Sequence, residues 1–229
     1  MWERLLDLDR RYIWGIMFLM VAFVLLNPFN LPIKVTDDTR QFYEFMESIP
    51  EGSIIWILPR FDAGSKGELM PELIATVKHA FRRNLKIVFA TNYPAAPQLY
   101  QEYVGKVAAA MGKEYGVDWL NLGFNPGDAV YVQQLTKDVA RATAGVDYFG
   151  KPLQEYPLAK DIPALNAETV AMVMDITSNG CAFTLEYVAE PTGIPMACGS
   201  MQMSLPIDKP YLDSGQYKAL KIGRASCRE

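Results

Sequence analysis

The stretch that decides the fold runs from Ile54 to Thr91 and reads IIWILPRFDAGSKGELMPELIATVKHAFRRNLKIVFAT. It begins and ends with short apolar runs, at residues 54–58 and 85–91, which are typical of strands buried on both faces. Between them, residues 68–84 show helical spacing. The inward stripe of this helix is Met70, Ile74, Val77 and Phe81. A strand, an amphipathic helix and a second strand predict a right-handed crossover between parallel strands.

The alternation continues on both sides of this unit. Upstream, Thr36 or Asp37 can cap a short helix that ends at Pro50-Glu51-Gly52. Its apolar face consists of Phe42, Phe45, Met46 and Ile49. Downstream, the pattern predicts helices at residues 97–116, 128–143 and 181–190, and strands at 117–122, 169–176 and 194–199. The fold class is therefore α/β, a three-layer Rossmann-like or flavodoxin-like parallel sheet whose strand order the sequence does not fix.

One segment interrupts the alternation. Residues 144–168 contain three prolines, two glycines and the aromatic residues Tyr148, Phe149 and Tyr156. A loop of this length in a compact domain is usually a lid, a binding element or a segment with its own packing. We expect an ordered excursion that is packed by its aromatic side chains, with a lid as the alternative.

A hydrophobic segment precedes the domain. Residues 12–26 read YIWGIMFLMVAFVLL without a charge, and residues 27–33 continue apolar at alternate positions. Together, residues 12–33 reach the length of about 20 residues that a bilayer helix needs, and Tyr12 and Trp14 suit an interfacial aromatic belt. A cleavable signal peptide and a buried core helix are the alternatives. Because no small-residue cleavage pattern follows Leu26, we expect an uncleaved transmembrane anchor.

Flanking charges predict the orientation of this anchor. Arg4, Arg10 and Arg11 precede it, whereas Lys34 and Arg40 follow it. The positive-inside rule then places the N-terminus in the cytoplasm and the globular domain outside, at the cell membrane.

The net charge is −4 with no basic stripe, so nucleic acid is not an expected partner. The expected partners are the lipid bilayer and another membrane or surface protein.

The last residues do not read as natural sequence. Residues 222–229, IGRASCRE, reverse-translate into a common short-read sequencing adapter, and Lys221 can already carry its first bases. A natural basic tail is the alternative. We treat this segment as an artefact, which discounts Cys227 and leaves Cys181 and Cys198. The expected organisation is a cytoplasmic segment at 1–11, an anchor at 12–33, an α/β domain at 34–221 and the artefact tail at 222–229.

Several motifs together resemble a family of membrane-anchored proteins of unknown function. They are Pro50-Glu51-Gly52-Ser53, Phe61-Asp62, His79-Ala80-Phe81-Arg82-Arg83, KEYGVDWLNLGF at 113–124, Asp175 and Tyr211-Leu212-Asp213-Ser214-Gly215-Gln216. The resemblance covers the chain from the anchor to the tail. It implies a Rossmann-like domain held outside the cytoplasm between two transmembrane helices, the second of which would follow the Ser-Gly-Gln stretch. It implies no activity and no catalytic residues.

Ligands of open parallel sheets bind beyond the carboxyl ends of the strands, where the strand order reverses. That rule selects polar residues in the loops after each predicted strand. The candidate ligand-binding residues are Arg60, Asp62, Ser65, Asn92, Asn125, Asp175, Ser178, Asn179 and Ser200. Asp62 and Asp175 each end an apolar strand, so on neighbouring strands they could share a cation, polarise a ligand or meet Arg60 or Lys66. The alternative is that each carboxylate only satisfies backbone N–H groups of the following turn.

Cofactor motifs are missing from the places where they would act. The loop after the first strand reads Arg60-Phe61-Asp62-Ala63-Gly64 instead of G-x-G-x-x-G, so we expect no dinucleotide. No Walker-type phosphate loop and no G-x-S-x-G nucleophile elbow occur in the sequence. We therefore expect no cofactor, and the sequence assigns neither a metal ligand nor a catalytic residue.

Two residue types need a separate interpretation. His79, the only histidine, lies in mid-helix away from the apolar stripe, so we expect it to face solvent or a neighbouring element. Cys181 and Cys198 are expected in the core, either as free thiols or joined by a disulfide.

The favoured hypothesis is a membrane-tethered, non-catalytic domain that binds a partner protein or a small ligand. Its alternatives are a hydrolase-like enzyme using Asp62 and Asp175, and a structural subunit whose membrane helices do the work.

Overall fold

The structure is a computed structural model, and it describes residues 9–27 and 37–222. The chain divides into two compact units, Met1–Lys34 and Val35–Glu229.

The larger unit is built on one six-stranded sheet in the order β3-β2-β1-β4-β5-β6. All of its strand pairings are parallel. The strands are β1 (Ile54–Arg60), β2 (Lys86–Thr91), β3 (Trp119–Phe124), β4 (Met172–Thr177), β5 (Met196–Ser200) and β6 (Ala219–Ile222). The α/β prediction is therefore confirmed, with a Rossmann-like order that reverses between β1 and β4.

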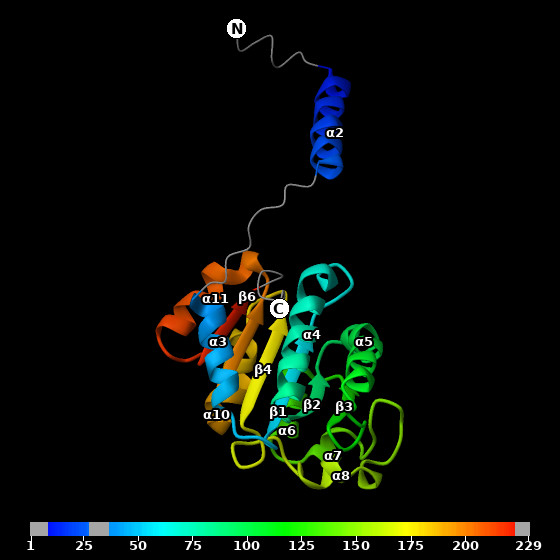
Figure 1. Cartoon of the computed structure of the whole chain (residues 1–229), viewed down its shortest axis with the longest axis vertical. Helices are drawn as coiled ribbons and strands as arrows, with labels where there is room; N and C mark the ends of the chain where they lie inside the picture. The colour runs from blue at the N-terminus through cyan, green and yellow to red at the C-terminus, as the bar shows by residue number, and fades with distance from the viewer. Residues whose placement is uncertain (1–8, 28–36, 223–229) are drawn as a thin grey trace. The chain divides into compact units, whose positions relative to one another are not determined.

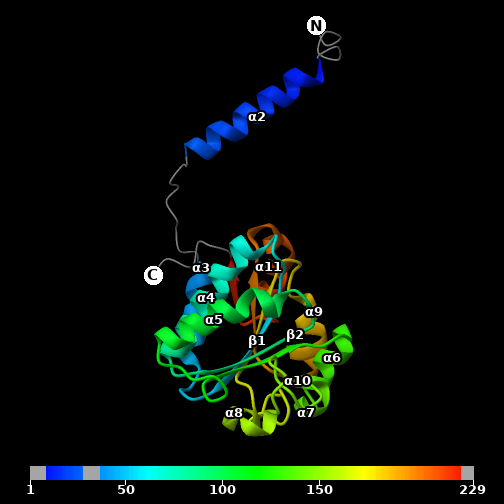
Figure 2. The same cartoon turned by 90° about the vertical axis from the view of Figure 1, so that its right-hand side faces the viewer.

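Helices cover both faces of the sheet (Figures 1 and 2). One face carries α3 (Asp37–Ser48), α4 (Lys66–Arg82) and α5 (Ala96–Ala110). The other elements are α6 (Asp128–Leu135), α7 (Val139–Ala142), η1 (Leu153–Glu155), α8 (Pro157–Lys160), α9 (Ala182–Thr184), the π-helical turn η2 (Leu185–Ala189), α10 (Glu190–Thr192), η3 (Gln202–Ser204) and α11 (Leu205–Asp213). Because both faces are covered, residues 54–59 of β1 are all buried.

Several elements differ from the sequence prediction, and the helix expected at 181–190 is divided into α9, η2 and α10. The helix expected at 128–143 breaks into α6 and α7, because Asp138 is extended and its side chain accepts a hydrogen bond from the backbone N–H of Arg141. The helix expected at 97–116 ends at Ala110, and Gly112 and Gly116 follow with positive φ. Beyond β5 the sequence predicted neither α11 nor β6, and β6 ends at Ile222, the first residue assigned to the adapter.

The hydrophobic segment forms the helix α2 (Arg10–Leu26). Its start is capped by Asp9, whose side chain accepts a hydrogen bond from the backbone N–H of Arg11 at 3.0 Å. None of its side chains is buried. Within the described residues, no helix is both long and apolar enough to cross a membrane. The structure thus gives no support to the membrane-spanning part of the prediction, and residues 28–33 of the expected anchor lie outside the described residues.

The excursion at 144–168 is ordered and packed by aromatic rings, as expected. The buried Asp147 holds this segment in place. Its Oδ2 accepts hydrogen bonds from the hydroxyls of Tyr115 and Tyr156, both at 2.8 Å. The rings of Tyr156 and Phe149 pack edge-on against Tyr115. Gly116 has φ +81°, and a Cβ there would collide with the ring of Tyr156, so glycine is needed at this close approach.

Candidate functional site

The strand order places the expected crevice between β1 and β4, at their carboxyl ends. Leu58 pairs with Asp175 and Arg60 with Thr177, so the two strands end side by side. The loop after β1 and the loop after β4 flank this point, which is where open α/β sheets usually bind their ligands.

An ion pair occupies this position. Arg60 Nε donates to Asp175 Oδ1 at 3.0 Å, and Arg60 Nη2 donates to Asp175 Oδ2 at 2.5 Å. The Asp175 side chain is fully buried and the Arg60 side chain is 11% exposed. This two-point geometry is the strong form of an arginine–carboxylate contact.

Further contacts support both partners of the pair. Thr184 Oγ1 donates to Asp175 Oδ2 at 2.7 Å, and Arg60 Nη2 also donates to the carbonyl of Gly180 at 3.2 Å. The guanidinium carbon of Arg60 lies 4.7 Å from the ring centroid of Phe183, a cation–π contact. Each carboxylate oxygen of Asp175 therefore accepts at least one hydrogen bond from a described residue.

Asp62 plays a different part. It is exposed, and its Oδ1 accepts from the backbone N–H of Ser65 at 3.1 Å and from Ser65 Oγ at 3.2 Å. The backbone N–H of Ser65 is the main reason that the pKa of Asp62 is lowered. The carboxylate thus serves the turn that begins α4. The structure does not join Asp62 to Asp175; of the partners considered for Asp175, it selects Arg60.

The asparagine candidates are held by structural contacts. Asn125 Nδ2 donates to the carbonyl of Ala142 at 2.9 Å, which ties the end of β3 to α7. Asn92 Nδ2 lies 3.4 Å from Asp128 Oδ1, a long contact between the loops after β2 and β3. These two residues are not brought to the ion pair by any hydrogen bond of the described residues.

Ser178 and Asn179 directly follow β4. The backbone carbonyl of Ser178 accepts from Ser204 Oγ at 3.1 Å, and the backbone N–H of Asn179 donates to Thr177 Oγ1 at 3.2 Å. The Ser178 hydroxyl lies 3.4 Å from Asn179 Oδ1, the one hydrogen bond that the described residues give these two side chains. These contacts shape the loop after β4, and the Asn179 side chain stays exposed.

Ser200 is buried in a polar cluster that sequence reasoning missed. Asp208 of α11 is fully buried, and its Oδ1 accepts from the backbone N–H of Cys181 at 2.9 Å. Burial, and then the nearby Asp175, raise the pKa of Asp208. The hydroxyls of Ser200 and Tyr217 interact with this carboxyl group, but neither reaches hydrogen-bond geometry with a described residue.

A disulfide joins Cys181 to Cys198 beside this cluster, with Cα atoms 5.8 Å apart. Both half-cystines are fully buried. Their sulfurs and a carboxylate oxygen of Asp208 lie within 4.8 Å of one another, the only such group among the described residues that has metal-ligand composition. Because both sulfurs are bonded to each other, they are not available as the thiolates that a soft metal would need.

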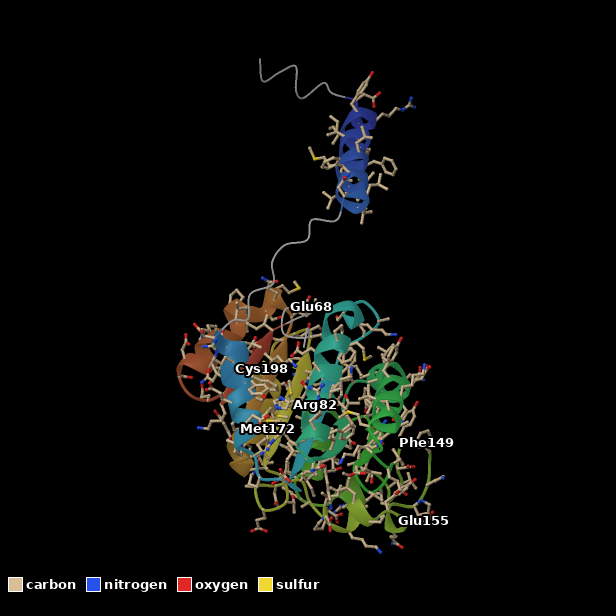
Figure 3. All side chains as sticks on the ribbon, viewed as in Figure 1. Glu68, Arg82, Phe149, Glu155, Met172 and Cys198 are labelled. Atoms are coloured by element: carbon tan, nitrogen blue, oxygen red, sulfur yellow. A yellow bond between two sulfur atoms is a disulfide. The ribbon has the colours of Figure 1, made fainter. Side chains whose placement is uncertain are left out.

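A cavity of about 480 Å³ lies away from the crevice, between α3 and α4. Figure 3 labels Arg82, which belongs to the α4 side of this cavity. The residues that line it are Thr39, Phe42, Tyr43, Glu47, Pro71, Ile74, Ala75, Lys78, His79, Arg82 and Lys221. From the sequence alone Lys78 and Arg82 are interpreted as cations near the C-terminal end of a helix, where they favour the helix dipole. The opposite wall of the cavity lies on α3, which is distant in the chain.

His79 belongs to the wall of this cavity. Its Nε2 lies 2.8 Å from Glu47 Oε1, and its ring stacks on Tyr43 with centroids 4.7 Å apart. Arg83 Nε lies 3.4 Å from the other oxygen of Glu47. His79 therefore contacts the neighbouring helix α3, one of the two environments expected for it.

A second hollow, of about 380 Å³, lies at the β3 edge of the sheet near Phe149 (Figure 3). It is lined by Gln101, Tyr115, Trp119, Phe149, Lys151 and Tyr156. Three of its lining side chains are the aromatic rings that pack residues 144–168. We therefore interpret this hollow as a surface of the structural aromatic cluster and not as a ligand site.

Together these features define a Rossmann-like α/β domain whose strand-end crevice is occupied by an internal ion pair. No family model matches the chain, and comparisons with curated proteins and with solved structures find no match either.

Proposed function

We propose that the chain is a membrane-tethered, non-catalytic α/β domain that binds a small ligand or a partner protein. The observation that carries this proposal is the ion pair between Arg60 and Asp175. At the crevice where α/β enzymes usually place reactive groups, the buried carboxylate is neutralised and saturated by its own chain. Asp62, the other acidic candidate, accepts a hydrogen bond from the backbone N–H of Ser65 in the turn that begins α4.

The tether is proposed from the hydrophobic segment. Residues 12–26 lie in the helix α2 and carry no charged side chain, and none of their side chains is buried. A bilayer would cover such a surface. We propose that the residues after Leu26 complete the span.

The extracytoplasmic location is proposed from two features. Arginines precede the hydrophobic segment, which favours a cytoplasmic N-terminus. The Cys181–Cys198 disulfide supports an oxidising compartment for the domain, since cytosolic thiols are normally kept reduced. Protease added to intact cells should then remove the α/β domain and leave the N-terminus protected. Protection of both would contradict this topology.

The first test is native mass spectrometry of the full-length protein, extracted gently from its own membrane. A co-extracted protein or a retained small molecule is the expected result. A bare chain under conditions that preserve other membrane complexes would count against a binding domain.

The competing hypothesis is a hydrolase that uses Asp62 and Asp175. If any hydrolytic activity is found, Asp62→Asn and Asp175→Asn decide its origin. Loss of activity in Asp62→Asn with unchanged folding would overturn the non-catalytic proposal. Asp175→Asn alone is not decisive, because it also removes a buried ion-pair partner.

A further inference from the structure

We propose that the cavity between α3 and α4 binds a small anionic molecule, with a phosphate or carboxylate group attached to an apolar or aromatic body. This inference rests on the proposed binding function and names the class of ligand. It does not involve the strand-end crevice.

The charges that line the cavity are mainly positive. Lys78, Arg82 and Lys221 carry positive charge, and Glu47 is the only acidic lining residue. Glu47 is already engaged by His79 at 2.8 Å and by Arg83 at 3.4 Å. Its charge is therefore balanced by these two side chains, and the positive charges of Lys78 and Arg82 are left for a ligand.

Lys78 and Arg82 are the residues directed at the ligand. They lie four positions apart on α4, so their side chains share one face of that helix. Both are exposed, and neither forms an ion pair or a hydrogen bond with any residue in 9–27 or 37–222. Two like charges at this spacing are unfavourable without a counterion. An anion between them removes that repulsion and can accept several charge-assisted hydrogen bonds.

Lys221 lies deeper in the cavity and has protein contacts. Its Nζ is 3.3 Å from Thr76 Oγ1 and 5.2 Å from the ring centroid of Phe42. Its charge adds to the potential of the cavity. The proposal nevertheless depends on Lys78 and Arg82, which lie well inside the chain.

The remaining walls suit an apolar body. Pro71, Ile74 and Ala75 of α4 face Phe42 and Tyr43 of α3 across the cavity. Tyr43 as a residue is 51% exposed, and its ring stacks on His79, so an aromatic surface lines the cavity against which a planar ligand can pack. A volume of about 480 Å³ lies in the range of small-molecule sites.

The probe for this site is phenyl phosphate, which combines an aromatic ring with a dianion. Full-length protein in phosphatidylcholine nanodiscs would be titrated, with binding followed by saturation-transfer NMR of the ring protons. We expect binding that weakens with added salt, and no comparable binding of the neutral analogue benzyl alcohol. Equal binding of benzyl alcohol, or no binding of phenyl phosphate, would overturn the proposal.

The matched variants change only exposed cations. Lys78→Gln/Arg82→Gln should weaken phenyl phosphate binding by about tenfold or more, the effect of losing charge-assisted hydrogen bonds. Lys137→Gln/Lys160→Gln removes the same charge from exposed positions outside the cavity and should leave the affinity unchanged. Equal affinities of the two double variants would place the anion elsewhere.

Nanodiscs that also contain phosphatidylglycerol distinguish two sources of the anion. Loss of phenyl phosphate binding there assigns the site to a lipid headgroup, and unchanged binding assigns it to a water-soluble molecule. Both results support the anionic site. If phenyl phosphate fails to bind while native mass spectrometry still finds a partner, this inference fails and the proposed binding function stands.

Discussion

Arg60 and Asp175 form a two-point ion pair across the β1–β4 junction, where the strand order of the sheet reverses. The two residues are 115 positions apart in the sequence, and the pair is supported by Thr184 and Phe183. A buried carboxylate without its cation is costly, so this pair matters more when one partner is missing than when both are replaced.

The first prediction concerns the loss of Arg60 alone. Arg60→Met leaves Asp175 buried and unpaired, and it should lower the free energy of unfolding by roughly 3–5 kcal/mol. Urea unfolding of the full chain in detergent, followed by near-ultraviolet circular dichroism, measures this effect.

The control for that prediction is the double variant Arg60→Met/Asp175→Asn. It removes both charges while Asn can still accept the hydrogen bond of Thr184, so it should recover part of the lost stability. A double variant that is less stable than Arg60→Met would show that the buried charge is not the source of the effect.

Much of the fold was predictable, because local patterns carry it. The apolar runs at 54–58 and 85–91 and the striped helix between them correspond to β1, α4 and β2. The strand order was not predictable, since parallel sheets with the same alternation can be wound in several orders. β6 was missed because Ala219–Ile222 is short and runs into the adapter-like tail.

The candidate site was predictable only in part. Asp175 and Arg60 were both identified from their positions at strand ends, but their pairing depends on which strands are neighbours. The α3–α4 cavity was missed for a similar reason. Lys78 and Arg82 look like ordinary helix C-terminal cations until α3 provides the opposite wall.

The second prediction concerns the Cys181–Cys198 disulfide, which links residues 17 positions apart. Cys181→Ala/Cys198→Ala should lower the free energy of unfolding by roughly 2–4 kcal/mol, because the unfolded chain loses a constraint. Urea unfolding with and without reductant measures this loss. The variant itself should not respond to reductant. Maleimide labelling of both cysteines in unreduced, denatured wild-type protein would contradict the disulfide.

The third prediction is an alkaline transition at Tyr156. Burial and the hydrogen bond to Asp147 raise the pKa of Tyr156 from 10.0 to about 12 in the folded state. Because the folded pKa is the higher one, the stability contributed by this group is complete below about pH 10 and is lost as the pH rises toward about 12.

Tyr156→Phe tests this transition. The variant should lose about 1 kcal/mol at neutral pH, the net value of a typical hydrogen bond. Its unfolding free energy should also decline less steeply than that of the wild type between about pH 10 and pH 12. Identical slopes for Tyr156→Phe and the wild type would contradict the prediction.

The fourth prediction concerns Asp208. Burial and the charge of Asp175 raise its pKa above the ordinary value of 3.8. The group therefore contributes stability below about pH 4, and this contribution is lost as the pH rises through the folded pKa. At about pH 7 a fully ionised Asp208 would be buried with one oxygen, Oδ2, lacking a hydrogen-bond partner among the described residues.

Asp208→Asn removes that cost without changing shape. The amide oxygen can still accept from the backbone N–H of Cys181, and the amide NH₂ can donate toward the hydroxyls of Ser200 and Tyr217. We expect the variant to be more stable than the wild type by about 1 kcal/mol at neutral pH, with the difference shrinking as the pH is lowered toward about 4. Glu168→Gln, which neutralises an exposed carboxylate, should show no such gain. Urea unfolding at both pH values decides the matter: a variant that is less stable than the wild type at neutral pH would mean that the Asp208 carboxylate is stabilised by a partner, such as a bound cation, that compensates its buried charge.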